Sequence, residues 1–335
     1  MVEQESEALV RAPAVNPLGR LRLPTPSGWQ DIILYAAFVA VCVFFTFATP
    51  YFFTWQNAEI ILIESATLAI VACGVTFVII AADIDLSIGS MYALAGTLAA
   101  YLMTNMNVPW PLAAAAVLGV GVLLGLTNGV LSVFGGIPSF LVTLGTLGVV
   151  RGIDLMLTGT AAIPIYEGDF NSFFAAPVFG FSRPIFWAIL VAVVTAVVLS
   201  RTIFGRHVYA VGGDYETSRL AGIPVGRIRI SNFVLAGFLA ALAGLIVAGR
   251  IQTGQPTIGT GLELDVVTAV ILGGTNLFGG RGHIFGTIVG AVMITAIGNG
   301  LLLLGADVNA QTIFKGAILI VVVLARRLAG AKDGP

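Results

Sequence analysis

Ten long apolar segments, separated by polar or glycine-rich stretches, run through the chain. They are residues 31–49, 58–81, 87–103, 110–134, 138–157, 185–200, 228–248, 264–278, 284–304 and 312–329. The hydrocarbon core of a bilayer is about 30 Å thick, and a helix of roughly 20 apolar residues crosses it. The alternating pattern of a membrane β-barrel is not seen in these segments. We therefore expect an all-α, polytopic membrane protein of about ten transmembrane helices, with nine or eleven as alternatives because segments 87–103, 185–200 and 264–278 are short.

The overall composition agrees with hydrocarbon as the main solvent of the chain. Of the 335 residues, 58% are hydrophobic and only 10% are charged, whereas a soluble domain has about 25% charged residues. The net charge of −1 gives no electrostatic reason to expect a nucleic-acid partner. Cys42 and Cys73 stand alone in apolar runs, and we predict no disulfide, metal site, cofactor or catalytic residue.

The two ends of the chain are polar. The first 30 residues are mixed in charge and rich in proline and glycine, and they lack the features of a signal peptide. We expect a flexible cytoplasmic tail over residues 1–30, a transmembrane domain over 31–329 with a cytoplasmic loop at 201–227, and a short cytoplasmic tail at 330–335.

Basic residues orient the predicted helices, because cytoplasmic loops are enriched in lysine and arginine. With ten crossings and an internal N-terminus, three clusters face the cytoplasm: Arg11, Arg20 and Arg22; Arg201, Arg206, Arg219, Arg227 and Arg229; and Arg326, Arg327 and Lys332. Arg183 and Arg250 fall on the outer side as exceptions. We expect both termini inside the cell.

Glycines at four-residue spacing predict close helix packing, since small residues let backbones approach in lipid. The pairs and triplets are Gly121, Gly125 and Gly129; Gly148 and Gly152; and Gly286 and Gly290. Residues 88–93 also resemble residues 285–290, at an offset of 197 residues that we interpret as about five spans. This match suggests a five-plus-five internal pseudo-repeat, an architecture known among transporters.

The stretch 82–90 places Asp83, Asp85 and Ser87 between two apolar segments. Carboxylates at membrane depth are costly unless they are solvated or paired. Two interpretations stay open: Asp85 caps the next helix by accepting backbone N–H bonds, or these residues belong to a translocation pathway or its gate.

Residues 255–265 and 273–282 combine glycine with polar groups, including Glu263, Asp265 and Asn276. Irregular backbone persists at membrane depth only where protein or a water-filled cavity satisfies it. We therefore add these three residues to the candidate pathway or gate. The glycines are not a Walker phosphate loop, because neither Lys315 nor Lys332 follows them in the required place.

The stretch from Gly205 to Ile223 is the longest polar stretch predicted to be cytoplasmic, apart from the N-terminal tail. Asp214 to Leu220 is predicted as a short helix, with Gly212 and Gly213 before it and Gly222 and Pro224 after it. A charged surface helix on a membrane protein can dock a soluble partner. The alternative is a solvated connector.

Together these stretches resemble the permease family of ribose- and xylose-type sugar ABC importers. The family motif Gly-Ile-Asp-Leu-Ser-Val-Gly-Ser is matched by residues 84–90, its cytoplasmic glycine-arginine motif by 205–223, and its late Gln-Pro and glycine motifs by 255–282. All three occur in order, over a resemblance that covers about residues 31–329. Three positions depart from the pattern: Asp83 replaces a glycine, Asp214 an asparagine and Ala221 a serine.

The resemblance implies a permease subunit in the bacterial inner membrane that translocates a monosaccharide or related small polyol. It implies a homodimer or paired permease, cytoplasmic ATP-binding subunits and a periplasmic or lipid-anchored sugar-binding protein. It also implies that Gly212, Gly213, Asp214, Arg219 and Gly222 dock the ATPase, so the chain itself is not an enzyme.

Two rival functions use different chemistry. An ion-coupled secondary transporter needs titratable groups inside its core spans, for which the chain offers Asp154 and Glu64. A membrane-embedded enzyme needs clustered His, Cys or carboxylate residues, and the sequence shows no such cluster.

Overall fold

The computed structural model describes the backbone of residues 29–330 and the side chains of 34–307, 309–321 and Leu324. Residues 1–28 and 331–335 of the predicted tails, with Arg11, Arg20, Arg22 and Lys332, lie outside these residues, as do the side chains of Arg326 and Arg327. The predicted tail boundaries at 30 and 330 are wrong by one or two residues, because α1 begins at Trp29 and α13 ends at Gly330. The helices are α1 (Trp29–Ala48), α2 (Trp55–Ile80), α3 (Ile88–Thr104), α4 (Trp110–Val133), α5 (Ser139–Thr158), α6 (Gly168–Ala175), α7 (Arg183–Arg201), α8 (Ile203–Gly213), α9 (Tyr215–Leu220), α10 (Val225–Ile251), α11 (Leu262–Leu272), α12 (Ile284–Leu303) and α13 (Val308–Gly330).

Four two-residue strands complete the described elements. Strand β1 (Ile163–Pro164) pairs antiparallel with β4 (Thr253–Gly254), and β2 (Pro177–Val178) pairs antiparallel with β3 (Phe181–Ser182). The first pair ties the α5–α6 connection to the segment after α10, two parts of the chain that are about 90 residues apart.

The prediction of an all-helical, multi-pass membrane protein is confirmed. Six described helices, α2, α4, α5, α7, α10 and α12, are long and apolar enough to cross a bilayer. The apolar parts of α1, α3 and α13 are shorter, at 10–17 residues.

One predicted span is wrong in its extent. Segment 264–278 was expected to be a single transmembrane helix, but α11 ends at Leu272 after 11 residues. Gly274, Gly279 and Gly280 have positive φ angles of 104°, 87° and 74°, which glycine adopts without steric strain. The chain from 273 to 283 is therefore a loop.

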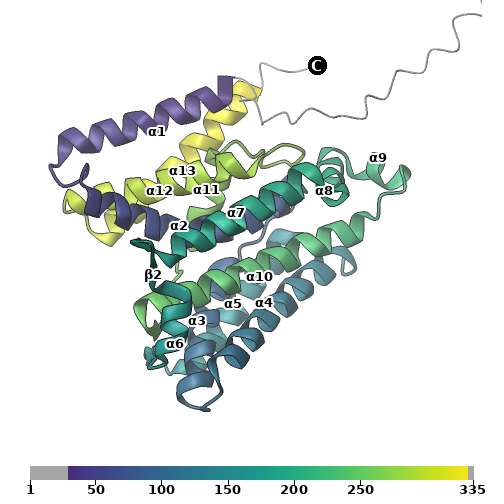
Figure 1. The fold of residues 1–335 in the computed structure, drawn as a ribbon. Coiled ribbons are helices and arrows are strands. Elements are labelled where there is room, and N and C mark those ends of the chain that lie inside the picture. The colour runs from purple at the N-terminus through teal and green to yellow at the C-terminus, as the bar shows by residue number, and fades with distance from the viewer. Residues whose placement is uncertain (1–28, 331–335) are drawn as a thin grey trace, which may run out of the picture.

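Helix α2 lies at the centre of the bundle. Figure 1 shows α3, α4, α5 and α10 on one side and α1, α12 and α13 on the other, with α2 and α7 between them. Of the most apolar stretch of α2, 89% is buried by protein, compared with 22% for α5 and α7. The apolar faces of α5 and α7 thus lie mostly on the outside of this single chain.

The predicted glycine packing is confirmed at two of three places. A methyl group at Gly121 or Gly125 of α4 would overlap the carbonyl oxygens of Gly237 or Phe233 in α10. Gly290 of α12 packs in the same way on the Ala269 carbonyl of α11, and Gly286 on the Gly273 carbonyl directly after α11.

Gly148 and Gly152 of α5 behave differently. A methyl group at either position would meet no atom within 4 Å, so the prediction of close packing is wrong for this pair within the chain.

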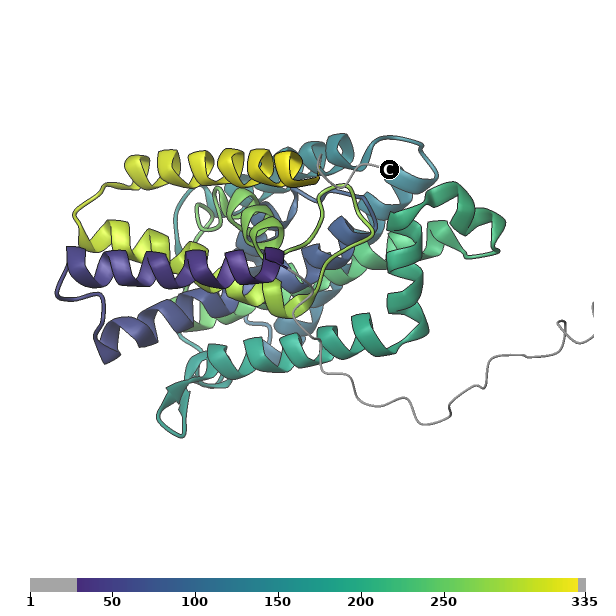
Figure 2. The same cartoon turned by 90° about the horizontal axis from the view of Figure 1, so that it is seen from above.

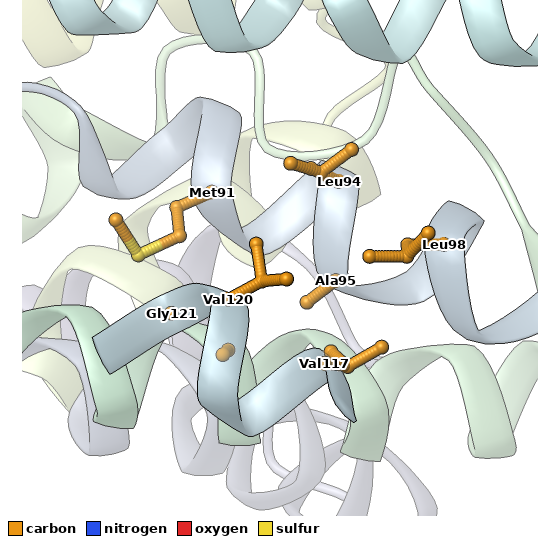
Figure 3. Close-up of a pocket in the computed structure, with 8 residues that line it drawn as sticks. Met91, Leu94, Ala95, Leu98, Val117, Val120 and Gly121 are labelled. Carbon is orange, nitrogen blue, oxygen red and sulfur yellow. The ribbon is translucent and has the colours of Figure 1, made fainter. Parts of the chain in front are cut away.

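Helices α3 and α4 meet along a dry seam. Figure 3 shows Met91, Leu94 and Leu98 of α3 facing Val117 and Val120 of α4 around a narrow apolar crevice. The crevice is too narrow for a water molecule. It is a packing defect and has neither the polar groups nor the volume for a sugar.

The bundle has two distinct ends. Helices α8 and α9, which we call the arm (residues 203–220), project at one end, and the β2–β3 hairpin lies at the opposite end (Figures 1 and 2). Helix α8 was not predicted, because its glycines at 205, 212 and 213 are typical of loops.

The internal match between residues 88–93 and 285–290 pairs α3 with α12. These are the third and the ninth of the ten helices that correspond to the predicted segments, six helices apart. Our interpretation of the 197-residue offset as five spans is therefore wrong, and the match does not supply a five-plus-five register.

Candidate functional site

The connection between α2 and α3, residues 81–87, forms an elbow inside the protein. Asp85 is fully buried, and its Oδ1 accepts hydrogen bonds from the Ser87 backbone N–H at 2.9 Å and the Ser87 hydroxyl at 2.6 Å. Ser87 is the N-cap position of α3 but makes no side-chain cap bond. Asp85 therefore closes a turn just before the helix, and the capping hypothesis is correct only in that it accepts a backbone N–H.

The side-chain amide of Asn128 connects the elbow to α4 and α5. Asn128 of α4 donates from Nδ2 to the Ser87 hydroxyl at 2.9 Å, and its Oδ1 accepts from the Thr146 hydroxyl of α5 at 2.7 Å. Asn128 and Ser87 are fully buried. Asp85, Ser87, Asn128 and Thr146 thus form one chain of hydrogen bonds between three helices, which we call the elbow network.

Asp83, at the other end of the elbow, forms an ion pair with Arg229 of α10. Arg229 donates from Nε to Oδ2 at 2.8 Å and from Nη2 to Oδ1 at 2.7 Å. Asp83 is only 3% exposed. A carboxylate at this depth is tolerated because both of its oxygens are engaged by a planar, two-pronged donor.

The arm packs against the end of α2 without room for a side chain. A methyl group at Gly212 would overlap the carbonyl oxygen of Ile80. The same carbonyl accepts the backbone N–H of Gly280 at 2.8 Å, and Tyr209 donates to the carbonyl of Gly282 at 2.6 Å. The arm, the end of α2 and the 273–283 loop therefore meet at one junction.

Asn276 shapes this loop. Its backbone N–H donates to the carbonyl of Arg281 at 2.9 Å, and its Oδ1 accepts from the Phe278 backbone N–H at 3.1 Å. The side chain holds the turn that carries Gly279 and Gly280 to the junction.

The outer surface of the arm is open and carries both polar and apolar side chains. The predicted helix from Asp214 to Leu220 is confirmed as α9, with Asp214 as its N-cap. The backbone N–H of Thr217 donates to Asp214 Oδ1 at 2.8 Å and holds the pKa of that carboxyl below its usual value. Gly213, Arg219 and Gly222 are exposed, and Leu220 is 83% exposed.

The segment between α10 and α11, residues 252–261, turns back along α3, and we call it the re-entrant segment. A methyl group at Gly254 would lie 2.7 Å from the Thr97 Cα, and one at Gly259 would lie 2.7 Å from the Gly89 carbonyl oxygen. The segment therefore follows α3 from its middle to its first turn.

Arg151 of α5 holds the re-entrant segment in place. Its Nη1 donates to the carbonyl of Pro256 at 2.5 Å, with Ile258 O at 3.4 Å. Since irregular backbone inside a membrane must find its partners within the protein, a guanidinium that satisfies two carbonyls is well suited to this position.

Acidic residues follow in the first turn of α11. Glu263 lies against Gly89 of α3, where a methyl group would overlap its carboxylate. Asp265 accepts from the Lys315 ammonium of α13 at 2.7 Å. The ion pair neutralises Asp265 between two helices.

Comparison with known proteins identifies the class of molecule to which this arrangement belongs. Residues 57–323 match the family described as "Branched-chain amino acid transport system / permease component". The chain is 38% identical over 302 residues to the ribose import permease protein of Haemophilus influenzae, covering 89% of this chain and 93% of that protein. The chain belongs to this permease family. No solved structure matches it.

Two further relatives of the permease are named for sugars. It is 33% identical over 290 residues to the D-allose transport system permease protein of Escherichia coli, covering 87% of this chain and 89% of the relative. It is 31% identical to the xylose transport system permease protein of the same organism, covering 91% and 95%. The predicted resemblance to sugar ABC permeases is confirmed.

The predicted site residues lie in four groups. Asp83, Asn276 and Gly212 lie at the arm junction, Asp85 and Ser87 lie in the elbow network, and Glu263 and Asp265 begin α11. Gly213, Asp214 and Arg219 are exposed on the outer surface of the arm, and Gly222 is exposed in the connection between the arm and α10.

Sequence reasoning missed four residues of the permease: Arg151, Arg229, Asn128 and Thr146. A signal existed for Arg151, since a lone arginine inside an apolar segment is expensive and marks an internal partner or pathway. Arg229 was counted only as a cytoplasmic charge, because its partner is 146 residues away in sequence.

Proposed function

We propose that this permease is the translocating subunit of an ATP-driven importer and passes a monosaccharide or a related small polyol. The observation that carries the proposal is the similarity over nearly the whole chain to permeases named for ribose, allose and xylose. The buried polar side chains of the elbow network and the irregular backbone of the re-entrant segment support the proposal, because irregular backbone persists at membrane depth only where protein or a water-filled cavity satisfies it.

The proposed architecture has ten crossings, with the arm and both termini in the cytoplasm. The eighth crossing is made by the re-entrant segment, α11 and the 273–283 loop together. The arginines at 201, 206, 219, 227 and 229 support this orientation. The five-plus-five pseudo-repeat stays a prediction.

One introduced cysteine tests the orientation, in a variant whose Cys42 and Cys73 are replaced by serine. Tyr215→Cys lies on the exposed side of α9, so in intact spheroplasts it should resist a membrane-impermeant maleimide and react only after the membrane is opened. Labelling in intact spheroplasts would place the arm outside and end the importer proposal.

The proposed partners divide the work. A cytoplasmic ATPase docks on Gly212, Gly213, Asp214, Arg219 and Gly222, a second permease completes the pathway, and an external binding protein delivers the sugar to the end that carries α6 and β2–β3. Asp83, Asp85, Ser87, Glu263, Asp265 and Asn276 are proposed as pathway or gate residues. A pathway of modest affinity suffices, because selectivity is better placed in the binding protein.

The docking surface can be tested without disturbing the fold. A Cβ atom at Gly213 would meet no atom of this chain within 4 Å, and Gly213 is exposed. Gly213→Trp should therefore insert and fold normally but fail to co-purify the cognate ATPase. Gly168→Trp is the matched control, since Gly168 also faces open space but lies in α6 at the other end. Normal co-purification with Gly213→Trp would remove this surface from the proposal.

A further inference from the structure

We propose that the Asp83–Arg229 ion pair is the positioning contact through which movement of the arm reaches the elbow network. The inference rests on the proposed function, because it assumes that an ATPase moves the arm. It goes beyond that function because it assigns Asp83 and Arg229 the role of transmitting movement between the arm and the elbow network.

The geometry of the pair suits the transmission of movement. Two parallel hydrogen bonds of 2.7 and 2.8 Å join the guanidinium to both carboxylate oxygens. A bidentate pair fixes the orientation of its partners as well as their separation. When α10 rotates or shifts, Asp83 must follow.

Arg229, at one end of the pair, lies nine residues after the arm ends at Leu220. Arg229 lies in the second turn of α10, which begins at Val225 directly after α9. The short connection is closed by hydrogen bonds from Ile223 N to Ser218 O at 3.1 Å and from Ile228 N to Pro224 O at 3.1 Å. Displacement of α9 is therefore carried into the first turns of α10.

The other end of the pair belongs to the elbow. The next residue, Ile84, donates its N–H to the Ser139 hydroxyl of α5 at 3.2 Å and accepts from the Thr143 hydroxyl at 3.2 Å. Asp85 follows and begins the elbow network. Asp83 is thus two residues from the hydrogen bonds that join α3, α4 and α5.

The pair is not needed merely to hold the arm against the bundle. Gly212, Ile80, Gly280 and Tyr209 already make that contact through backbone packing and hydrogen bonds. Replacing a buried ion pair by well-packed hydrophobic residues of similar volume is often neutral for stability, whereas removing one partner leaves an uncompensated buried charge. Asparagine keeps nearly the volume of Asp83, glutamine is uncharged and shorter than Arg229, and their amides can still hydrogen-bond to each other. The stability and the coupling roles of this pair can therefore be separated by removing both charges together.

The decisive variant is Asp83→Asn/Arg229→Gln in full-length permease, purified with its cognate ATPase and binding protein and reconstituted in vesicles. Uptake of D-ribose, D-xylose and D-allose is measured together with ATP hydrolysis and thermal melting. We expect normal melting, normal ATPase co-purification and continued ATP hydrolysis, with sugar moved per ATP reduced about tenfold, a typical size for the coupling between two sites. Arg227→Gln, exposed and two residues from Arg229, should transport normally.

Charge exchange supplies the second test. Asp83→Arg alone and Arg229→Asp alone should each lower the amount of sugar moved per ATP. The double variant Asp83→Arg/Arg229→Asp restores the ion pair with its charges exchanged and should recover most of this loss. Normal sugar transport per ATP in Asp83→Asn/Arg229→Gln would overturn the proposal. It would also be overturned if Asp83→Arg/Arg229→Asp folded normally but did not recover sugar transport per ATP. Failure of the wild-type permease to co-purify an ATPase would instead contradict the proposed function, and this inference would fall with it.

Discussion

At the scale of single residues, glycine sets how closely two helices of this permease approach. Gly121 and Gly125 let α4 lie against the backbone of α10, where any side chain would overlap a carbonyl group. Gly148 sits in a helix of similar composition but faces open space. The same residue type is therefore structurally required in one helix and replaceable in the other.

Alanine substitutions should separate the two cases. Gly125→Ala forces α4 away from the Phe233 carbonyl and should destabilise the fold by about 1–3 kcal/mol, the usual range for overpacking. Gly148→Ala should be neutral or stabilise by up to ~1 kcal/mol, since alanine favours helix more than glycine. Thermal melting in detergent measures both, and equal melting temperatures would contradict the packing seen between α4 and α10.

The lowered pKa of Asp214 predicts how the stability of α9 depends on pH. Its folded pKa lies below the usual 3.8 because it accepts the Thr217 N–H. A lowered pKa means that the ionised cap stabilises α9 above pH 3.8 and that this stabilisation is lost as pH falls through the lowered value.

Amide exchange at residues 217–221 should therefore show constant protection, after correction for intrinsic rates, between about pH 5 and pH 8. Asp214→Asn should keep most of the protection, because asparagine also caps helices well, whereas Asp214→Ala should lose it at every pH. Equal protection in the alanine variant would show that tertiary contacts alone hold α9.

At the scale of elements, the re-entrant segment is the least regular part of the bundle and depends on a neighbouring helix. Its glycines allow it to lie along α3, and Arg151 of α5 holds two of its carbonyls. The segment is therefore fixed by a side chain about 105 residues earlier in the sequence.

Removing the guanidinium should release this segment. A hydrogen bond from a charged donor contributes about 1.5–3 kcal/mol, so Arg151→Gln should raise amide exchange at residues 257–261 and lower sugar uptake at least about tenfold. Arg183→Gln is the matched control, because Arg183 likewise donates to carbonyls, those of Ser172 and Phe173, at the other end of the bundle. Unchanged exchange at 257–261 in the Arg151 variant would contradict a holding role.

At the scale of the whole molecule, the question is which energy source drives the permease. Asp154 is buried and accepts a hydrogen bond from Thr97, and Glu64 is exposed on α2. These are the acidic residues that an ion-coupled mechanism would use, whereas the importer mechanism needs neither to change its protonation.

Uptake in whole cells distinguishes the two mechanisms. We expect sugar uptake to continue after a protonophore collapses the proton gradient, provided that ATP is maintained, and to stop when ATP is depleted. Glu64→Gln should keep uptake within about twofold of wild type, as expected for a surface substitution. Uptake that follows the proton gradient and is lost in this variant would favour the ion-coupled alternative.

The amino-acid sequence by itself determined the features that depend on neighbouring residues. Apolar length predicted the membrane class and most helices, and Asp214, Gly222 and Pro224 predicted α9, because capping and helix ending act over a few residues. The motifs at 84–90, 205–223 and 255–282 were sufficient to indicate the family.

Only the tertiary structure decided what depends on distant partners. The end of α11 at Leu272, the different surroundings of Gly125 and Gly148, and the pairing of Asp83 with Arg229 follow from how helices far apart in sequence pack together. The spacing of residues along one helix indicates which of them share a face, but it does not indicate which residues of other helices pack against that face. For a buried carboxylate such as Asp83, the partner across the bundle decides whether its charge is tolerated.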